Sequence, residues 1–185
     1  MPHSKILDKE KCVLVVVDIQ EAFRHAIGDL AVVASRAAMA VRGFQVLEIP
    51  VIVTEQYPKG LGRTVEEILF TLPPEFETVE KNSFSSCGSG VFMDKLKAAA
   101  ASQVVLCGIE AHVCVNQTAH DLLDQGFQVH LLTDCVASRF EHDRHAGIYK
   151  MLASGVVPSS VEMALFEAMR DSTHEKFKEI QAIIK

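Results

Sequence analysis

The chain has 185 residues, which is a common length for one domain and enough to bury a substantial core. The net charge of −6, with no basic cluster, disfavours nucleic acid and anionic membrane surfaces as partners. The five cysteines are an odd number without a C-x-x-C pair. This pattern disfavours a disulfide framework or a structural zinc site and indicates a reducing compartment.

Membrane and export signals are missing from the sequence pattern. No apolar run approaches the roughly 20 residues of a membrane span, and residues 1–11 are too polar for a secretory signal. We therefore expect one domain over residues 1–185 in a soluble, cytoplasmic protein, with mitochondrial targeting left open.

Strand and helix patterns alternate along the chain. We predict strands at residues 12–17, 51–54, 77–80, 104–107, 127–133 and 156–157, most of which are runs rich in apolar side chains. The predicted helices are residues 28–43, 65–70, 91–101, 143–154, 161–169 and 177–184, with a further helix that opens at Cys114 and ends at a left-handed cap at Gly126. This alternation predicts a three-layer α/β/α domain with a mainly parallel sheet.

Polar side chains follow most of the predicted strands directly. Asp18 follows the first strand, Lys81 the third, and residues 110–114 the fourth; Glu55 and Gln56 follow the second and Asp134 the fifth. Ligands of such sheets bind outside the carboxyl ends of the strands. An acid, a cation and a thiol that meet there have the parts of a nucleophilic catalyst.

Each of the three central residues has a catalytic and a structural interpretation. Cys114 at a helix start would gain thiolate character from the helix dipole, but a buried cysteine also packs as a small hydrophobe. Asp18 also fits a helix cap, and Lys81 also fits an ordinary exposed lysine. The pattern of residues alone leaves these alternatives open.

Three segments resemble the signatures of the isochorismatase-like cysteine hydrolases. They are Val-Val-Asp-Ile-Gln at 16–20, Glu-Lys-Asn-Ser-Phe-Ser at 80–85 and Gly-Ile-Glu-Ala-His-Val-Cys-Val at 108–115. Their order and spacing fit from about residue 11 to residue 185. The resemblance is closest to the isochorismatase domain-containing proteins whose substrate is unassigned.

The resemblance implies a Rossmann-like fold with a six-stranded parallel sheet and a catalytic triad of Asp18, Lys81 and Cys114. In this mechanism Lys81 lowers the pKa of Cys114, and Asp18 acts as general base and acid. Cys114 attacks a carbonyl to form a thioester, which water then hydrolyses. The resemblance also places the backbone N–H groups of Glu110 and Cys114 in an oxyanion hole, beside a cis peptide bond between Ile109 and Glu110.

Two departures from the family narrow the expected chemistry. Isochorismate-cleaving members lack the cysteine, so Cys114 argues against vinyl-ether hydrolysis. Members that hydrolyse nicotinamide carry a metal-binding Asp-x-His after the second strand, where this chain reads Thr-Glu-Gln-Tyr at 54–57. We therefore expect no metal, no cofactor and poor nicotinamidase activity.

We predict a metal-independent cysteine hydrolase that acts on non-peptide C–N bonds of a small amide, or on a related acyl compound. The candidate substrate-binding residues, chosen by position, are Gln20, Phe23, Gln56, Tyr57, Asn82, Phe84 and His112. His112 has the alternative of bonding to a loop backbone.

Other functions and the assembly state stay open at this stage. One alternative is a catalytically silent binding protein, and another is a thiol redox sensor with Cys87 as the second thiol. The expected partners are a small-molecule substrate and further copies of the chain, with no nucleic acid and no membrane. We expect a homodimer or higher homo-oligomer, with the predicted helix 161–169 as the candidate interface.

Overall fold

The computed structural model describes residues 3 and 5–185, and its centre is a six-stranded sheet with the order β3-β2-β1-β4-β5-β6. Every neighbouring pair of strands in this sheet is parallel. The strands are β1 (Cys12–Val17), β2 (Val51–Gln56), β3 (Val79–Lys81), β4 (Gln103–Ile109), β5 (Gln128–Ala137) and β6 (Val157–Ser159). The predicted α/β class with a six-stranded parallel sheet is confirmed.

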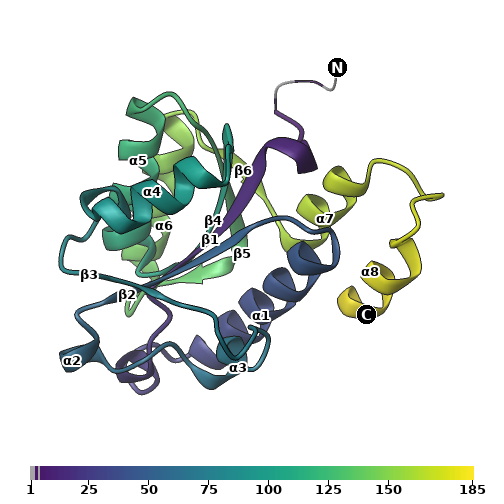
Figure 1. Ribbon diagram of the computed structural model, residues 1–185. Helices are drawn as coiled ribbons and strands as arrows, with labels where there is room; N and C mark the ends of the chain where they lie inside the picture. Colours follow the sequence, from purple (N-terminus) through teal and green to yellow (C-terminus); the bar gives the residue numbers. More distant parts are fainter. Residues whose placement is uncertain (1–2, 4) are drawn as a thin grey trace.

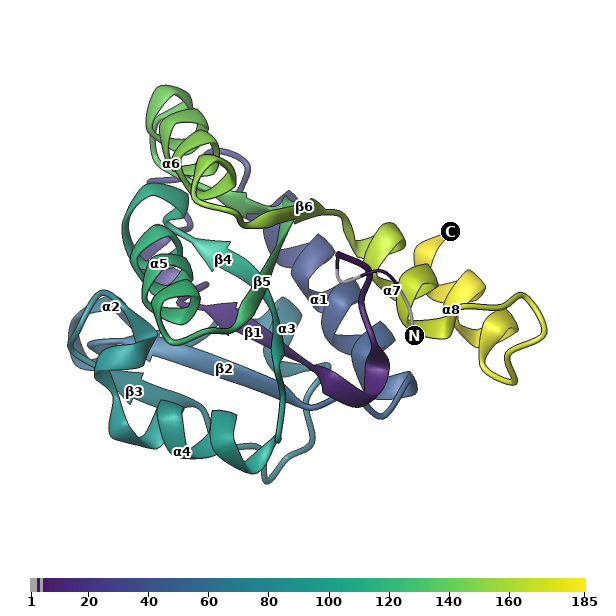
Figure 2. The same cartoon turned by 90° about the horizontal axis from the view of Figure 1, so that it is seen from above.

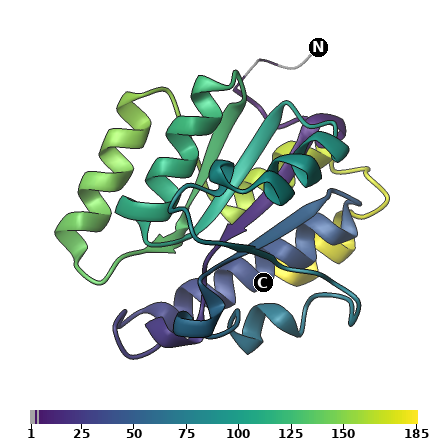
Figure 3. The ribbon, with the colours of Figure 1, turned by 60° about the vertical axis from the view of Figure 1, so that its left-hand side comes forward.

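Helices cover both faces of the sheet (Figures 1 and 2). The longer helices are α1 (Leu30–Val46), α4 (Gly90–Ala98), α5 (Asn116–Asp124), α6 (Glu141–Ala153), α7 (Val161–Met169) and α8 (Phe177–Ile184), and the one-turn helices are α2 (Pro58–Leu61) and α3 (Glu66–Leu69). Helices α4, α5 and α6 lie on one face, and α1 and α7 on the other. Helix α8 packs beside α1, as its yellow ribbon shows in Figure 3. Within residues 3 and 5–185, none of the helices has the length and apolar character to cross a membrane.

The central strand β1 contributes side chains to the hydrophobic core on each face of the sheet. All six of its residues are buried, and their side chains alternate between the two faces of the sheet. Leu14 and Val16 belong to the core under α1 and α7, whereas Val13, Val15 and Val17 belong to the core under α4, α5 and α6. A continuous β-branched run is the pattern that a strand buried on both faces requires.

Two glycines at the ends of predicted segments, Gly43 of helix 28–43 and Gly108 after strand 104–107, lie inside elements of the structure. Gly43 sits within α1, where an added Cβ would lie 2.6 Å from the methyl groups of Leu165. Gly108 sits within β4 with a φ of +131°, and an added Cβ would lie 2.1 Å from the carbonyl oxygen of Val17. Gly108 therefore needs glycine for its φ and for the close approach of the Val17 backbone, whereas Gly43, within its helix, packs against the flexible side chain of Leu165. Gly126, after α5, has the left-handed φ of +84° that we predicted.

Strand β5 runs three residues past Asp134, which we had placed at its end. The Asp134 carboxylate accepts hydrogen bonds from the backbone N–H of Val161, at 3.2 and 3.3 Å, and pairs with Arg36 at 3.1 Å. It therefore joins α7 and α1 to the sheet. The prediction that Asp134 is a strand-end site residue is wrong.

Helix α7 has the bounds that we predicted, but its apolar side is already covered within the chain. Val161, Ala164, Leu165 and Ala168 are buried in the core shared with α1. Met163 is 50% exposed. The face that we expected to lie between protomers is thus used for folding.

Candidate active site

Asp18 follows β1, and its carboxylate accepts hydrogen bonds from two neighbouring strands. Lys81 Nζ at the end of β3 lies 2.6 Å from Asp18 Oδ2, and Thr54 Oγ1 of β2 donates to Asp18 Oδ1 at 2.7 Å. Asp18 is 1% exposed and has a φ of +52°, a region in which aspartate is enriched among non-glycine residues. Its oxygens bond across the sheet edge, so the helix-cap alternative is wrong.

The strand register explains why these side chains meet. Val17 pairs with Thr54 on one side and with Gly108 on the other, so Asp18 is the next residue at the carboxyl edge. Lys81 pairs with Gln56 one strand further out. Neighbouring parallel strands therefore bring an acid and a cation from distant parts of the chain to one point.

The Lys81 ammonium is buried and surrounded by acceptors, contrary to the exposed-lysine alternative. Besides Asp18, it donates to Gln56 Oε1 at 3.0 Å, to the Ser83 carbonyl at 3.1 Å and to the Phe84 carbonyl at 2.9 Å. Its side chain is 0% exposed. Four acceptors compete for three N–H groups, so Lys81 acts as a fixed cation with no donor left for a ligand.

Cys114 lies in a π-helical turn, Ala111–Val115, that leads into α5. The helical path therefore starts three residues before Cys114, not at it as we predicted. Burial raises the pKa of Cys114 to about 12, helped by the charge of Asp18 and a hydrogen bond to it, whereas Lys81 lowers this pKa. The predicted low thiol pKa is wrong, because the loss of water outweighs the nearby cation. The resting side chain is a neutral thiol beside a buried ion pair.

The other thiols share the burial but not this setting. Burial also raises the pKa of Cys12 to about 12 and that of Cys87 to about 11, and it raises those of Cys107 and Cys135. Within the described part of the chain, Cys114 is the thiol influenced by both Asp18 and Lys81. Cys114 therefore differs from the other four cysteines in its charged neighbours and not in having a low pKa.

The turn before Cys114 is held by a second buried carboxylate. The peptide bond between Ile109 and Glu110 is cis, and the Glu110 carbonyl accepts from the backbone N–H groups of Val113 and Val115. Glu110 Oε1 accepts from both the backbone N–H and Nε of Arg139, each at 3.0 Å. The turn is thus held by backbone hydrogen bonds within it and by the bonds that Arg139, in the loop after β5, donates to Glu110.

The isochorismatase domain family model matches residues 12–163, which contain all of these groups. The chain belongs to the isochorismatase family. It is 40% identical to isochorismatase domain-containing protein 2 of Danio rerio over 96% of this chain and 89% of that protein.

Two solved structures place this isochorismatase-family chain among its relatives. MAR1 ribonuclease from Caenorhabditis elegans is 37% identical, with a TM-score of 0.91 over 97% of this chain and 92% of that one. The YcaC gene product of Escherichia coli, an octameric hydrolase of unknown specificity, has a TM-score of 0.87 at 20% identity, over 100% of this chain and 91% of that one. The similarity to the Escherichia coli protein shows a shared fold only.

Four of the predicted substrate-binding residues lie around Lys81. Gln56 accepts from its ammonium and donates to the Asn82 carbonyl at 2.8 Å. The Phe84 carbonyl also accepts from Lys81, while the Phe84 ring is 55% exposed. Tyr57 is 54% exposed at the start of α2. Tyr57, Asn82 and Phe84 are exposed to a ligand, whereas Gln56 is half-buried.

The other three have different surroundings. Gln20 is fully buried, and its amide bonds to the backbone of Gln56 and to the Gly62 carbonyl, so it fastens the loop after β2. Phe23 packs against the core on the α1 side. His112 Nδ1 lies 3.0 Å from Ser138 Oγ, so it bonds to a loop side chain rather than to a loop backbone.

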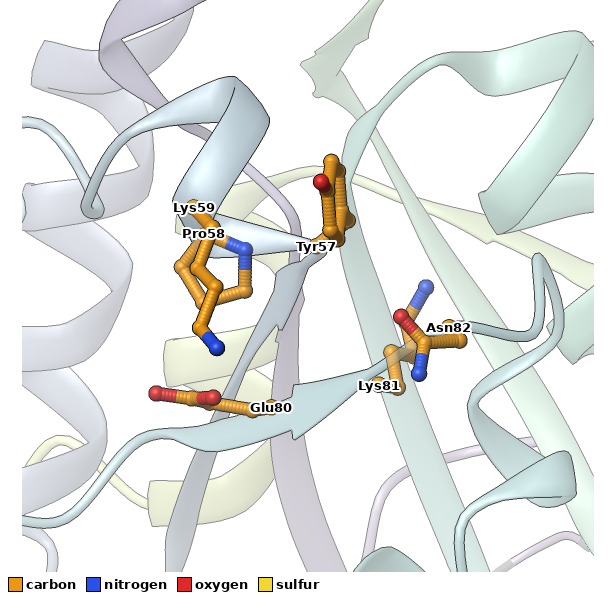
Figure 4. Close-up of a pocket in the computed structure, with 6 residues that line it drawn as sticks. All are labelled: Tyr57, Pro58, Lys59, Glu80, Lys81 and Asn82. Atoms are coloured by element: carbon orange, nitrogen blue, oxygen red, sulfur yellow. The ribbon is translucent and has the colours of Figure 1, made fainter.

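A pocket of about 230 Å³ opens beside the ion pair, between α2 and the edge strand β3 (Figure 4). Its lining residues are Tyr57, Pro58, Lys59, Glu80, Lys81 and Asn82. Tyr57 and Asn82 were predicted for the pocket wall from their position after β2 and β3. Lys81 lines this pocket and pairs with Asp18, so the pocket adjoins the buried charges, although neither Asp18 nor Cys114 lines it.

Thr54 and Arg139 touch the site and were missed from the sequence. Thr54 lies inside β2, and because β-branched residues are common in strands its sequence position gave no sign of a role in the site. Arg139 follows a strand whose end we placed too early. Among residues 3 and 5–185, no group of three or more His, Cys, Asp or Glu side chains has an arrangement that fits a metal ion.

Proposed function

We propose that this isochorismatase-family protein is a cysteine hydrolase that cleaves a small amide or related acyl compound at a non-peptide C–N bond. The observation that carries the proposal is the buried Asp18–Lys81 pair, 2.6 Å apart, beside the thiol of Cys114. A base, a fixed cation and a nucleophile are the parts that acyl transfer through a thioester requires.

The first half of the reaction forms the acyl-enzyme. Because the pKa of Cys114 is about 12, the thiol keeps its proton until the substrate arrives. Asp18 takes this proton as the sulfur attacks the carbonyl carbon. Asp18 then gives the proton to the leaving nitrogen, the C–N bond breaks, and the acyl group stays on sulfur as a thioester.

The second half releases the acid. Asp18 takes a proton from water as the water oxygen attacks the thioester carbonyl, and the C–S bond breaks as the proton returns to sulfur. The products are a carboxylic acid, an amine and the original thiol. Lys81 does not exchange protons in this scheme, because its N–H groups are used by four acceptors. It favours negative charge on the Asp18 and Cys114 pair.

The developing oxyanion needs donors that are in place beforehand. We propose the backbone N–H groups of Glu110 and Cys114 for this role. The Arg139 contacts to the Glu110 carboxylate support the proposal, because they fix the turn that carries both N–H groups.

The test is to incubate the protein with a panel of small amides and measure its mass after rapid acid quenching. We expect an added acyl mass on the peptide that contains Cys114, and none in Cys114→Ala. Cys107→Ala is the matched control, because Cys107 is a buried thiol in the adjoining strand β4. Turnover of any panel member by Cys114→Ala at the wild-type rate would refute the proposal.

Two rival functions receive less support. A redox sensor needs a thiolate, yet burial raises the pKa of both Cys87 and Cys114. RNA cleavage, suggested by the name of the Caenorhabditis elegans relative, needs contact with a polyanion, and this chain carries a net charge of −6.

We also propose that the protein forms a homodimer or higher homo-oligomer. The support is the octameric state named for the Escherichia coli relative. Sedimentation at micromolar concentration should give a mass of at least twice 20.3 kDa. A single species of 20.3 kDa would contradict this proposal and leave the cysteine chemistry untouched.

A further inference from the structure

Helix α6 lies directly against the backbone of the turn that carries Cys114, and Gly147 is the point of contact. An added Cβ on Gly147 would lie 2.8 Å from His112 Cα, 2.9 Å from His112 N and 2.9 Å from the carbonyl oxygen of Ala111. All three are backbone atoms of the turn Ala111–Val115. A backbone cannot turn aside as a flexible side chain can, so a larger residue at position 147 would displace the turn or the helix.

The helix itself gives no other reason for this glycine. Gly147 is buried in the middle of α6 (Glu141–Ala153), and its φ is not positive. Alanine stabilises the interior of a helix better than glycine, because glycine loses more backbone freedom on folding. The close approach of the turn is therefore the feature that glycine serves here.

The loop before α6 adds a polar contact to the same turn. Ser138 is 6% exposed, and its Oγ lies 3.0 Å from His112 Nδ1. The backbone of His112 is thus packed against Gly147, and its side chain is bonded to Ser138. The position of the turn therefore depends on α6 and on the loop before it.

We propose that Gly147 and Ser138 are positioning residues that hold the backbone N–H groups of Glu110 and Cys114 in place for the developing oxyanion. Ala111 and His112 lie between these two N–H groups in the chain, so a shift of their backbone would move the donors. Oxyanion donors are effective because they are in position before the charge develops. The inference rests on the proposed function and names the contacts that keep its oxyanion hole in place.

The test compares two reactions of the Cys114 thiol with reagents of similar size. With p-nitrophenyl acetate, the thiol loses its proton, sulfur bonds to the acetyl carbon through an oxyanion, and p-nitrophenolate leaves. With p-nitrobenzyl bromide, the thiol also loses its proton and sulfur displaces bromide, but no oxyanion forms. The rate of each reaction is measured by the mass of the Cys114 peptide, in the folded protein and in the same chain unfolded in urea.

We expect the ratio of the acylation rate to the alkylation rate to be higher in the folded wild type than in the unfolded chain. Gly147→Ala should lower this ratio at least about tenfold, because a displacement of about 1 Å can cost about a hundredfold in a positioned reaction. Gly90→Ala is the matched control, because Gly90 opens α4 and, within the described residues, nothing lies within 4 Å of an added Cβ. It should keep the wild-type ratio.

Ser138→Ala tests the same turn without adding an atom to the interior. It removes the hydroxyl that bonds to His112 and should lower the ratio by roughly two- to fivefold, as the loss of one hydrogen bond allows. Thermal melts of each variant show whether it is folded during the assay. If Gly147→Ala does not fold, Ser138→Ala decides the outcome.

Three results would overturn the inference. The first is a wild-type ratio in folded Gly147→Ala or, where that variant does not fold, in Ser138→Ala. The second is an equal change in both rates, which is expected if these residues only stabilise the fold. The third is a wild-type ratio no higher than that of the unfolded chain. Failure of the proposed function is distinguishable, because it appears as the absence of an acyl-enzyme with every amide, whereas the ratio is measured with an activated ester.

Discussion

Polar groups are buried both at the carboxyl ends of β1 and β3 and near the start of β5, but only those of the first region have hydrogen-bond partners. Asp18 and Lys81 are 1% and 4% exposed, and each bonds to several partners. His130 of β5 is 0% exposed, and within the described residues neither of its ring nitrogens has a hydrogen-bond partner. One region is buried and satisfied, and the other is buried and unsatisfied.

This difference in hydrogen bonding gives the two regions different roles: one positions catalytic candidates, and the other makes the stability of the fold depend on pH. Hydrogen bonds to each other and to neighbouring residues hold Asp18 and Lys81 in one geometry, which a general base beside a nucleophile needs. His130 is surrounded by apolar strand residues and has no such geometry to keep. Desolvation lowers its pKa to about 4. We therefore expect the first region to control turnover and the second to control acid stability.

Removing the base should have the largest effect. Asp18→Asn keeps the size of the side chain but cannot accept the thiol proton, so turnover of the identified substrate should fall by roughly 10² to 10⁴-fold. Asp134→Asn is the control, because that carboxylate joins α7 and α1 to the sheet away from Cys114. It should lower the melting temperature and leave turnover close to wild type. Wild-type turnover in Asp18→Asn would exclude Asp18 as the base.

Removing the cation should destabilise the fold as well as the reaction. Lys81→Met leaves the Asp18 charge buried without its partner, which should lower the free energy of unfolding by about 3 to 5 kcal/mol. The double variant Asp18→Asn with Lys81→Met removes both charges and should recover part of that loss. Urea denaturation of the three proteins measures the difference. A single Lys81→Met variant as stable as wild type would mean that water reaches the pair.

Acid should act through His130. The imidazole pKa is 6.5 in the unfolded reference and about 4 in the folded protein. Unfolding therefore takes up a proton between these values, and the free energy of unfolding should fall by up to about 3 kcal/mol as the pH drops from 6.5 to 4. His130→Leu should flatten this dependence, measured by urea denaturation at pH 7 and pH 4.5. The same slope in both proteins would assign acid sensitivity to other groups.

The smallest effect should come from Thr54. Thr54→Val removes the hydroxyl that donates to Asp18 Oδ1 at 2.7 Å and leaves a buried carboxylate oxygen with one donor fewer. We expect a loss of about 1 to 3 kcal/mol in stability, and Thr54→Ser should restore most of it. Full stability in Thr54→Val together with a loss in Thr54→Ser would mean that the methyl group rather than the hydroxyl matters at this position.

The sequence was sufficient to place the catalytic candidates and insufficient to describe their electrostatics. Asp18 and Lys81 were found because a residue that follows a buried strand lies at the edge where parallel sheets bind ligands. The pKa of Cys114 was predicted in the wrong direction, because the sequence showed neither that the helical turn begins at Ala111 nor how deeply the thiol is buried. Arg139 was missed because β5 continues past Asp134, through a polar residue that resembles a strand end.

Close packing accounts for the remaining differences. Gly43 and Gly108 resemble terminators in the sequence, and the structure uses them where α1 meets Leu165 and where β4 meets β1. Such contacts join residues that are far apart in the chain, so they cannot be predicted from a local sequence pattern.

Burial and the charge of Asp18 keep Cys114 as a neutral thiol, and in the proposed mechanism Asp18 accepts its proton during attack. The direct measurement is the rate at which iodoacetamide modifies Cys114 at pH 7 in wild type, Asp18→Asn and Asp134→Asn. The charge of Asp18 and its hydrogen bond raise the pKa of Cys114, whereas Lys81 lowers this pKa. Replacing Asp18 while Lys81 remains should therefore increase the thiolate fraction of Cys114. We expect Asp18→Asn to be modified at least about tenfold faster than wild type while its turnover falls, and Asp134→Asn to match wild type. Slower modification of Cys114 in Asp18→Asn, with the fold intact, would contradict this expectation.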